Sequence, residues 1–162
     1  EKLVVFAPEH NFLPKIENIE VLSSKDDVMD MIGGLALKVS ERLDKRLTDH
    51  VVKIIILDFA HFVDGLDSVT QQKLISVLDK GYRVGYSSVI MSDSGISSRY
   101  DPVTKEVKKI SQVLLGLRYT DQTIVTAVNK PIREGQLGYQ EHYYIRQNTL
   151  NKIKVLVDKE SI

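Results

Sequence analysis

The chain has 162 residues, in which 22 Lys and Arg balance 22 Asp and Glu, and it contains no cysteine. The length suffices for one domain with a buried core, and the lack of cysteine excludes disulfides and thiolate chemistry. Zero net charge removes the long-range attraction that nucleic acid or an anionic membrane would exert. No apolar run approaches the roughly 20 residues that span a bilayer.

The amino-terminal part predicts one or two short strands. Residues 3–6 are apolar and are followed by Pro8, which favours a short buried strand that the proline ends. His10 would lie near its carboxyl end, where a lone histidine is more typical of a surface or capping group than of a ligand. Residues 19–22 predict a second strand or an extended connection. Because the chain begins with a strand and lacks an initiator Met, we expect it to be a piece of a longer protein.

The strongest helix prediction covers residues 24–47. Ser24 and Asp27 form a capping box with Asp in place of the usual Glu or Gln. Apolar residues then recur every three or four positions, at Val28, Ile32, Leu35, Val39, Leu43 and Leu47. Gly33 and Gly34 interrupt this helix, and since each costs about 1 kcal/mol relative to Ala, close packing or a bend is the expected reason.

The central feature is the apolar run at residues 51–57, which ends on Asp58. A run with Lys53 as its only charge predicts a strand buried on both faces, as in parallel sheets covered by helices. In such sheets ligands gather at the carboxyl ends of the strands. Asp58 therefore fits a Walker B carboxylate that holds Mg²⁺, although an aspartate there also serves as a helix cap or in an Asx-turn. The next residue is Phe59, where hydrolytic versions of the motif usually carry a second acid.

A second helix and a further strand follow. Ser68 and Gln71 predict a capping box, and Gly81 is expected to end this helix as a C-cap. Residues 83–91 predict a strand with Ser92 and Asp93 at its carboxyl end. This polar pair is either a sensor of a γ-phosphate beside Asp58 or a simple turn.

The last third of the chain predicts smaller elements. Asp101 before Pro102 favours the start of a short helix, and residues 113–117 read as a buried strand. A brief helix is expected from residue 120 to a point before Pro131.

A hairpin is predicted from residues 139–146 and 150–157. Tyr139, Tyr143 and Tyr144 make it the most aromatic part of the chain. They are candidates for a partner surface, and cross-strand packing explains them equally well. Because strand side chains alternate, Tyr139 and Tyr143 should point one way and Tyr144 the other. The alternation of strands and helices before this hairpin indicates an α/β sandwich with a mostly parallel sheet.

Four segments together resemble the later part of an FtsK/SpoIIIE-family P-loop ATPase domain, and most closely the carboxyl-terminal ATPase domain of EssC-type coupling proteins of type VII secretion. They are SERLDKRL before IIILDF, LDKGYRVGYSSVIMSDSGISSRYD, LLGLRYTDQT, and GYQEHYYIRQNTLNKIKV. The resemblance covers nearly the whole chain and implies a RecA-like P-loop NTPase sandwich over residues 1–162, a partial domain in which the phosphate-loop strand and helix are lacking. It also implies the cytoplasmic domain of a cell-membrane protein.

Two departures from the family pattern shape the expected activity. The chain has no GxxxxGK[ST] phosphate loop, and it carries Phe59 after the Walker B aspartate. The resemblance therefore implies a degenerate ATPase-like module that recognises secreted substrates and controls the adjacent ATPase domains of the same chain. ATP and Mg²⁺ are left open as cofactors of the full-length protein, and none is expected for this fragment. An oligomer is left open, and membrane insertion and nucleic-acid binding are not expected.

Two other functions fit the sequence less well. A DNA-translocating motor of the same superfamily needs Lys and Arg contacts to phosphates, which the neutral charge disfavours. An unrelated α/β enzyme that uses Asp58 or His61 as acid or base lacks a paired constellation of catalytic groups.

Overall fold

The computed structural model describes residues 2–7, 19–92, 96, 98–109, 112–115, 141–146 and 149–154. The chain forms two compact units, one made of Glu1–Ile96 and Tyr100–Val107 and the other of Ser97–Arg99 and Lys108–Ile162. The expectation of one domain over residues 1–162 stays a prediction.

The first unit contains a four-stranded parallel sheet. Its strands are β1 (Lys2–Phe6), β2 (Ile19–Leu22), β3 (Val52–Ile56) and β4 (Tyr86–Ile90), in the spatial order β2-β1-β3-β4. All three pairings are parallel, as the sequence predicts. The carboxyl ends of all four strands therefore lie at one edge of the sheet.

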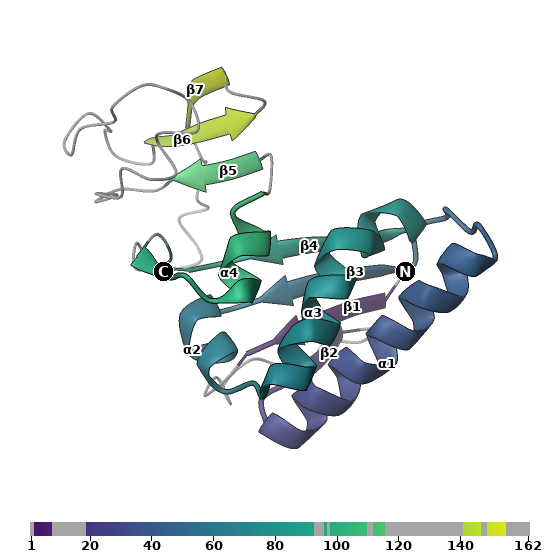
Figure 1. Ribbon diagram of the computed structural model, residues 1–162. Helices are drawn as coiled ribbons and strands as arrows, with labels where there is room; N and C mark the ends of the chain where they lie inside the picture. The colour runs from purple at the N-terminus through teal and green to yellow at the C-terminus, as the bar shows by residue number, and fades with distance from the viewer. Residues whose placement is uncertain are drawn as a thin grey trace. The chain divides into compact units, whose positions relative to one another are not determined.

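The helices α1 (Lys25–Asp44) and α3 (Ser68–Lys80) lie side by side on one face of this sheet (Figure 1), and α4 (Pro102–Val107) packs beside α3. The short helix α2 (Phe59–Asp64) lies between β3 and α3 in the chain, and the 3₁₀ helix η1 (Gly81–Val84) follows α3 directly. The helix α1 connects β2 to β3, and α3 connects β3 to β4, so both connections move in the same direction across the sheet. Because such connections are right-handed, the two helices lie on the same face. None of the helices in the described part of the chain is long and apolar enough to cross a bilayer.

The two faces of the sheet differ in burial, which corrects one prediction. In β3 the residues Val52, Ile54 and Ile56 are buried, whereas Lys53 is exposed and Ile55 is half-buried. The run at residues 51–57 is thus not buried on both faces. The fully buried face is the one that α1 and α3 cover, and no described helix lies on the other.

The helix caps follow the sequence in two of three cases. Ser24 caps α1 by accepting a hydrogen bond from the Asp27 N–H, and its hydroxyl donates to the Asp27 carboxylate. The predicted capping box at Ser68 is wrong, because Ser68 is already the first helical residue and Asp67 is the cap, accepting from the backbone N–H of the buried Thr70 at 2.8 Å. Asp and Ser are both good caps, so the sequence did not distinguish the two positions.

The cap of α4 repeats this arrangement. Asp101 accepts from the Thr104 N–H at 2.8 Å and from the Thr104 hydroxyl at 2.7 Å. The aspartate before Pro102 therefore starts the helix as the sequence predicts.

The ends of several elements also differ from the predictions. The first helix stops at Asp44 and β4 starts only at Tyr86. Gly81 is the C-cap of α3, as the sequence predicts, although its backbone is right-handed and it also begins η1. The left-handed glycine before β4 is Gly85, with φ 88°.

The second unit contains a three-stranded antiparallel sheet in the order β5-β6-β7. Its strands are β5 (Gln112–Leu115), β6 (Glu141–Arg146) and β7 (Thr149–Lys154). The hairpin is confirmed over the described residues Glu141–Arg146 and Thr149–Lys154, and the strand expected at residues 113–117 is present as β5, which pairs with β6 antiparallel. The helix expected between residue 120 and Pro131 lies outside the described residues.

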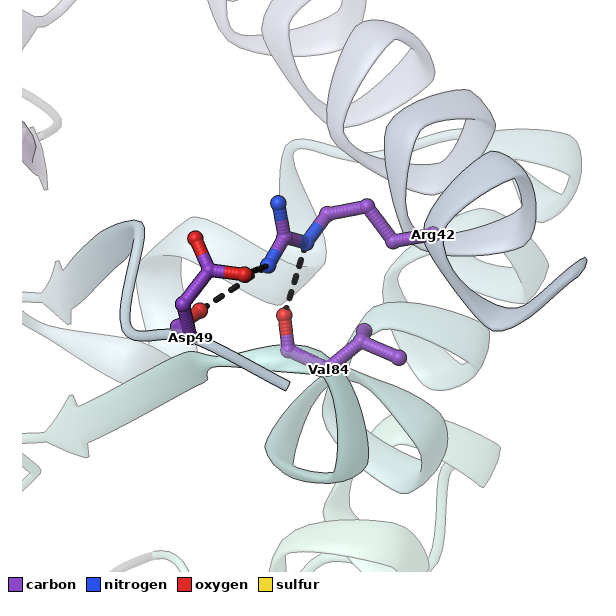
Figure 2. A network of polar contacts seen from close by, with 3 residues as sticks. All are labelled: Arg42, Asp49 and Val84. Carbon is purple, nitrogen blue, oxygen red and sulfur yellow. Dashed lines mark hydrogen bonds and ion pairs between the residues drawn. The ribbon is translucent and has the colours of Figure 1, made fainter. Parts of the chain in front are cut away.

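A polar network holds together three segments at the amino end of the parallel sheet. From the last turn of α1, the Arg42 Nε donates to the Val84 carbonyl at 2.9 Å, and its Nη2 donates to the carbonyl and the carboxylate of Asp49, each at 2.9 Å (Figure 2). Asp49 precedes β3 and Val84 precedes β4. The network therefore fixes where β3 and β4 begin.

Candidate functional site

Asp58 lies at the carboxyl edge of the parallel sheet, two residues after β3. The hydrogen bonds on either side of it hold both flanking residues: the Leu57 N–H donates to the Phe6 carbonyl at 2.9 Å, and the Phe59 N–H donates to the Met91 carbonyl at 3.0 Å. Asp58 is thus fixed between the ends of β1 and β4. Its side chain is exposed and makes no capping hydrogen bond to α2.

The backbone of Asp58 is left-handed, with φ 45° and ψ 62°. Among non-glycine residues this conformation costs roughly 1–2 kcal/mol, and Asp and Asn tolerate it better than most. Such strain persists only where the surrounding structure enforces it, and it concentrates at functional sites. The described residues have one other non-glycine position with positive φ, Arg46, in the turn after α1.

Ser92 lies at the same edge of the sheet as Asp58, because the Phe59 N–H bond to the Met91 carbonyl holds the end of β4 next to the turn after β3. Ser92 is exposed. The sheet therefore brings a carboxylate and a hydroxyl to the same edge, as the sequence predicts. The other proposed sensor residue, Asp93, lies outside the described residues.

Aromatic side chains anchor the segment that follows Asp58. Phe59 is 0% exposed, and Phe62, one turn later, packs on Phe6 of β1 with ring centroids 5.3 Å apart. The position where a hydrolytic domain would carry a second acid thus holds a side chain of the core. It supplies no group that could deprotonate a water molecule.

The described residues fit part of a Mg²⁺–nucleotide site. The carboxylate of Asp58 and the hydroxyl of Ser92 are hard oxygen donors at the same edge of the sheet. Mg²⁺ prefers such donors, often taking one or two protein carboxylates and completing its shell with water and phosphate. When bound, the ion would neutralise phosphate charge at this edge. No cluster of three or more His, Asp or Glu side chains that could hold a metal by itself occurs among the described residues. These oxygen donors could therefore supply part of a metal site, of which phosphate and water would supply the rest.

The tyrosine pair of β6 divides between two faces of the antiparallel sheet. Tyr143 is 8% exposed and shares its face with the buried Ile145, whereas Tyr144 is half-buried on the opposite face. The alternation that the sequence predicts is therefore present in this pair. Tyr139, the third candidate, lies outside the described residues.

A groove that the sequence analysis missed lies on the helix-covered face of the sheet, above β2. It encloses about 400 Å³ between α1 and the strands, and its lining includes Gly34, Lys38 and Leu22. The signal that could have indicated it is the pair of glycines within α1. A Cβ on Gly34 would meet nothing within 4 Å, so the close packing expected there is absent within the described chain.

Comparison with known proteins gives structural neighbours only. No family model matches the sequence, and no curated protein matches it. Among solved structures, the cytoplasmic domain of EssC has a TM-score of 0.68 at 13% identity, covering 96% of this chain and 33% of its own.

Two further solved structures are similar to this chain. EccC from Thermomonospora curvata (ATPases 2 and 3), in complex with a signal sequence peptide, has a TM-score of 0.67 at 12% identity, covering 98% of this chain and 31% of its own. The pCW3 conjugation coupling protein TcpA with ATPγS has a TM-score of 0.66 at 11% identity, covering 94% and 51%. The chain spans between about a third and a half of these structures. It has the RecA-like P-loop ATPase fold of the EssC, EccC and TcpA domains.

Proposed function

We propose that this chain is an ATPase-like module of a type VII protein secretion ATPase, on the cytoplasmic side of the membrane. In this role it recognises secreted substrates and controls neighbouring motor domains rather than hydrolysing ATP itself. The observation that carries the proposal is the pairing of this fold with Phe59, which is fully buried where catalysis would need an acid.

The lack of a catalytic acid supports the non-hydrolytic part. Asp58 offers a metal ligand, but the residue after it is the buried Phe59 instead of an acid, and the described residues beside it contain no glycine-rich loop whose N–H groups would hold phosphates. The purified chain should therefore release no phosphate from ATP above background. Hydrolysis that persists through repurification and disappears in Asp58→Ala would contradict this.

The antiparallel sheet supports the recognition part. Tyr144 lies half-buried on the face of β6 opposite the buried Tyr143 and Ile145, and aromatic side chains are typical anchors of protein interfaces. An EccC structure with the same fold holds a signal sequence peptide, which makes peptide binding a reasonable role for this chain as well.

The test compares two neighbouring tyrosines in the protein that contains this chain. Tyr144→Ala should weaken binding of a substrate's signal sequence peptide while the melting temperature stays nearly unchanged. Tyr143→Ala is the matched control, because it removes a buried ring and should lower stability. Equal losses of stability in both variants, with no specific binding defect, would assign Tyr144 to packing and leave recognition without this site.

A further inference from the structure

We propose that the groove above β2 is a docking site for an amphipathic helix of a partner protein, running antiparallel to α1. The groove belongs to the parallel-sheet unit, so this proposal is separate from peptide binding at Tyr144. It depends on three observations: a half-buried strand beside α1, a glycine that packing among the described residues does not explain, and the order of charges along α1.

The first observation is the position of the groove in the helix layer. The lining residues Val4, Leu22 and Val52 come from β1, β2 and β3 and share the face that α1 covers. Leu22 is only half-buried, as are the other residues of β2. β2 pairs only with β1 among the described residues. The hollow beside α1 is therefore where one more helix of the same layer would pack.

The second observation is Gly34, in the middle of the 20-residue helix α1. A glycine there costs about 1 kcal/mol relative to Ala, and no atom lies within 4 Å of the position that its Cβ would take. Packing inside the described chain thus gives no reason for the glycine. Helices pack 8–10 Å apart depending on the side chains between them, so a glycine that lines the groove lets a second helix approach closely.

The third observation is the charge order on the groove side of α1. Asp30 lies one turn before Gly34 and Lys38 one turn after it, and both line the groove. Neither side chain has a hydrogen bond or ion pair within the described residues. With a rise of 1.5 Å per residue, the two charges are about 12 Å apart along the helix.

This charge order selects the orientation of the partner helix. An antiparallel helix places its last turn beside Asp30 and its first turn beside Lys38. Basic residues in the last turn and acidic residues in the first turn are also the arrangement that a helix dipole favours. Large apolar side chains on the face between them would fill the hollow above Gly34.

The test uses a fluorescently labelled helical peptide with two glutamates in its first turn, leucines at its centre and two arginines in its last turn. Binding to the purified chain is followed by fluorescence anisotropy. Asp30→Lys and Lys38→Glu should each weaken binding by about fivefold, as expected for exposed ion pairs. The doubly reversed variant should instead prefer a peptide with reversed charges. Asp44→Lys, at the end of α1 outside the groove, is the matched control and should change little.

Filling and crosslinking variants test the position directly. Gly34→Leu should abolish peptide binding without lowering the melting temperature. Because the chain has no cysteine, Gly34→Cys introduces a unique thiol that should form a disulfide with a peptide carrying a central cysteine. Ser40→Cys, exposed on α1 but outside the groove, is the control. A peptide that fails to bind, or that binds equally to Gly34→Leu or to both charge orders, would overturn the proposal.

Discussion

Arg42 donates to both the carbonyl and the carboxylate of Asp49, and the same guanidinium reaches the carbonyl of Val84. One side chain, 15% exposed, thus ties the end of α1 to the residues before β3 and β4. Asp58 and Ser92 lie at the opposite ends of these strands. The positions of Asp58 and Ser92 therefore depend on how β3 and β4 are aligned at their amino ends, where Arg42 holds them.

Arg42→Ala should lower the free energy of unfolding by about 2 kcal/mol, because charged hydrogen bonds to carbonyls are lost and their acceptors are left unpaired. Arg42→Lys should recover little, since an ammonium cannot reproduce the fork of the guanidinium. Urea denaturation measures both changes. Lys45→Ala, exposed at the end of the same helix, serves as the control, and a loss as large as that of Arg42→Ala would remove the special role of the network.

Two glycines should respond to alanine in opposite ways. Gly85 has φ 88°, and an added Cβ would lie 1.9 Å from the Asp49 carbonyl oxygen, a backbone atom. Gly85→Ala should therefore destabilise the chain by more than about 1 kcal/mol or prevent folding. Gly34→Ala meets open space and should stabilise it by about 1 kcal/mol. Thermal melts of the two variants measure both changes. A lower melting temperature for Gly34→Ala would show that α1 needs its glycine for folding.

Acid should weaken the fold through two aspartates. The hydrogen bond from the Arg42 side chain holds the pKa of Asp49 below its usual 3.8, and the Thr70 N–H does the same for the pKa of Asp67. A pKa that is lower in the folded state contributes stability above the unfolded value and loses it as the pH falls through the folded one. Stability should thus fall below about pH 4.

Neutral variants isolate these two contributions. Asp49→Asn and Asp67→Asn each keep a hydrogen-bond acceptor but cannot titrate, and asparagine is also a good helix cap. Each should reduce the loss of stability between pH 4 and pH 2 in urea titrations. If both asparagine variants keep the full acid dependence of the parent, the loss comes from other carboxylates.

Much of this architecture follows from local pattern. The apolar runs locate the four parallel strands, and the acid after the third of them places Asp58 at the ligand-binding edge. The left-handed backbone of Asp58 could not be predicted, because it results from bonds to Phe6 and Met91, which are distant in sequence. The sheet that β5 joins could not be predicted either, since a short apolar run fits parallel and antiparallel sheets alike.

The carboxylate of Asp58 should matter for binding of Mg²⁺–nucleotide and should not stabilise the fold. Asp58→Gly removes the left-handed strain and should raise the free energy of unfolding by about 1 kcal/mol, while Asp58→Asn should leave it nearly unchanged. Both variants should weaken any binding of Mg²⁺–nucleotide by the full-length protein, which isothermal titration calorimetry measures. A clear loss of stability in Asp58→Gly would show that the carboxylate supports the fold itself.

Phe59 should not be convertible into a catalytic acid. The family pattern suggests Phe59→Glu as a route to hydrolysis, but this side chain is fully buried and its N–H is bonded to Met91. A carboxylate in that place would be buried without a partner, at a cost of several kcal/mol. The Phe59→Glu variant should therefore unfold at a much lower urea concentration than the parent. It should release no phosphate from ATP. His61→Glu is the control, because it adds an acid at an exposed position of the same helix, two residues later. This variant should fold normally. A stable Phe59→Glu variant that gains ATPase activity would mean that position 59 can turn toward the nucleotide edge, and the non-hydrolytic assignment would then fail.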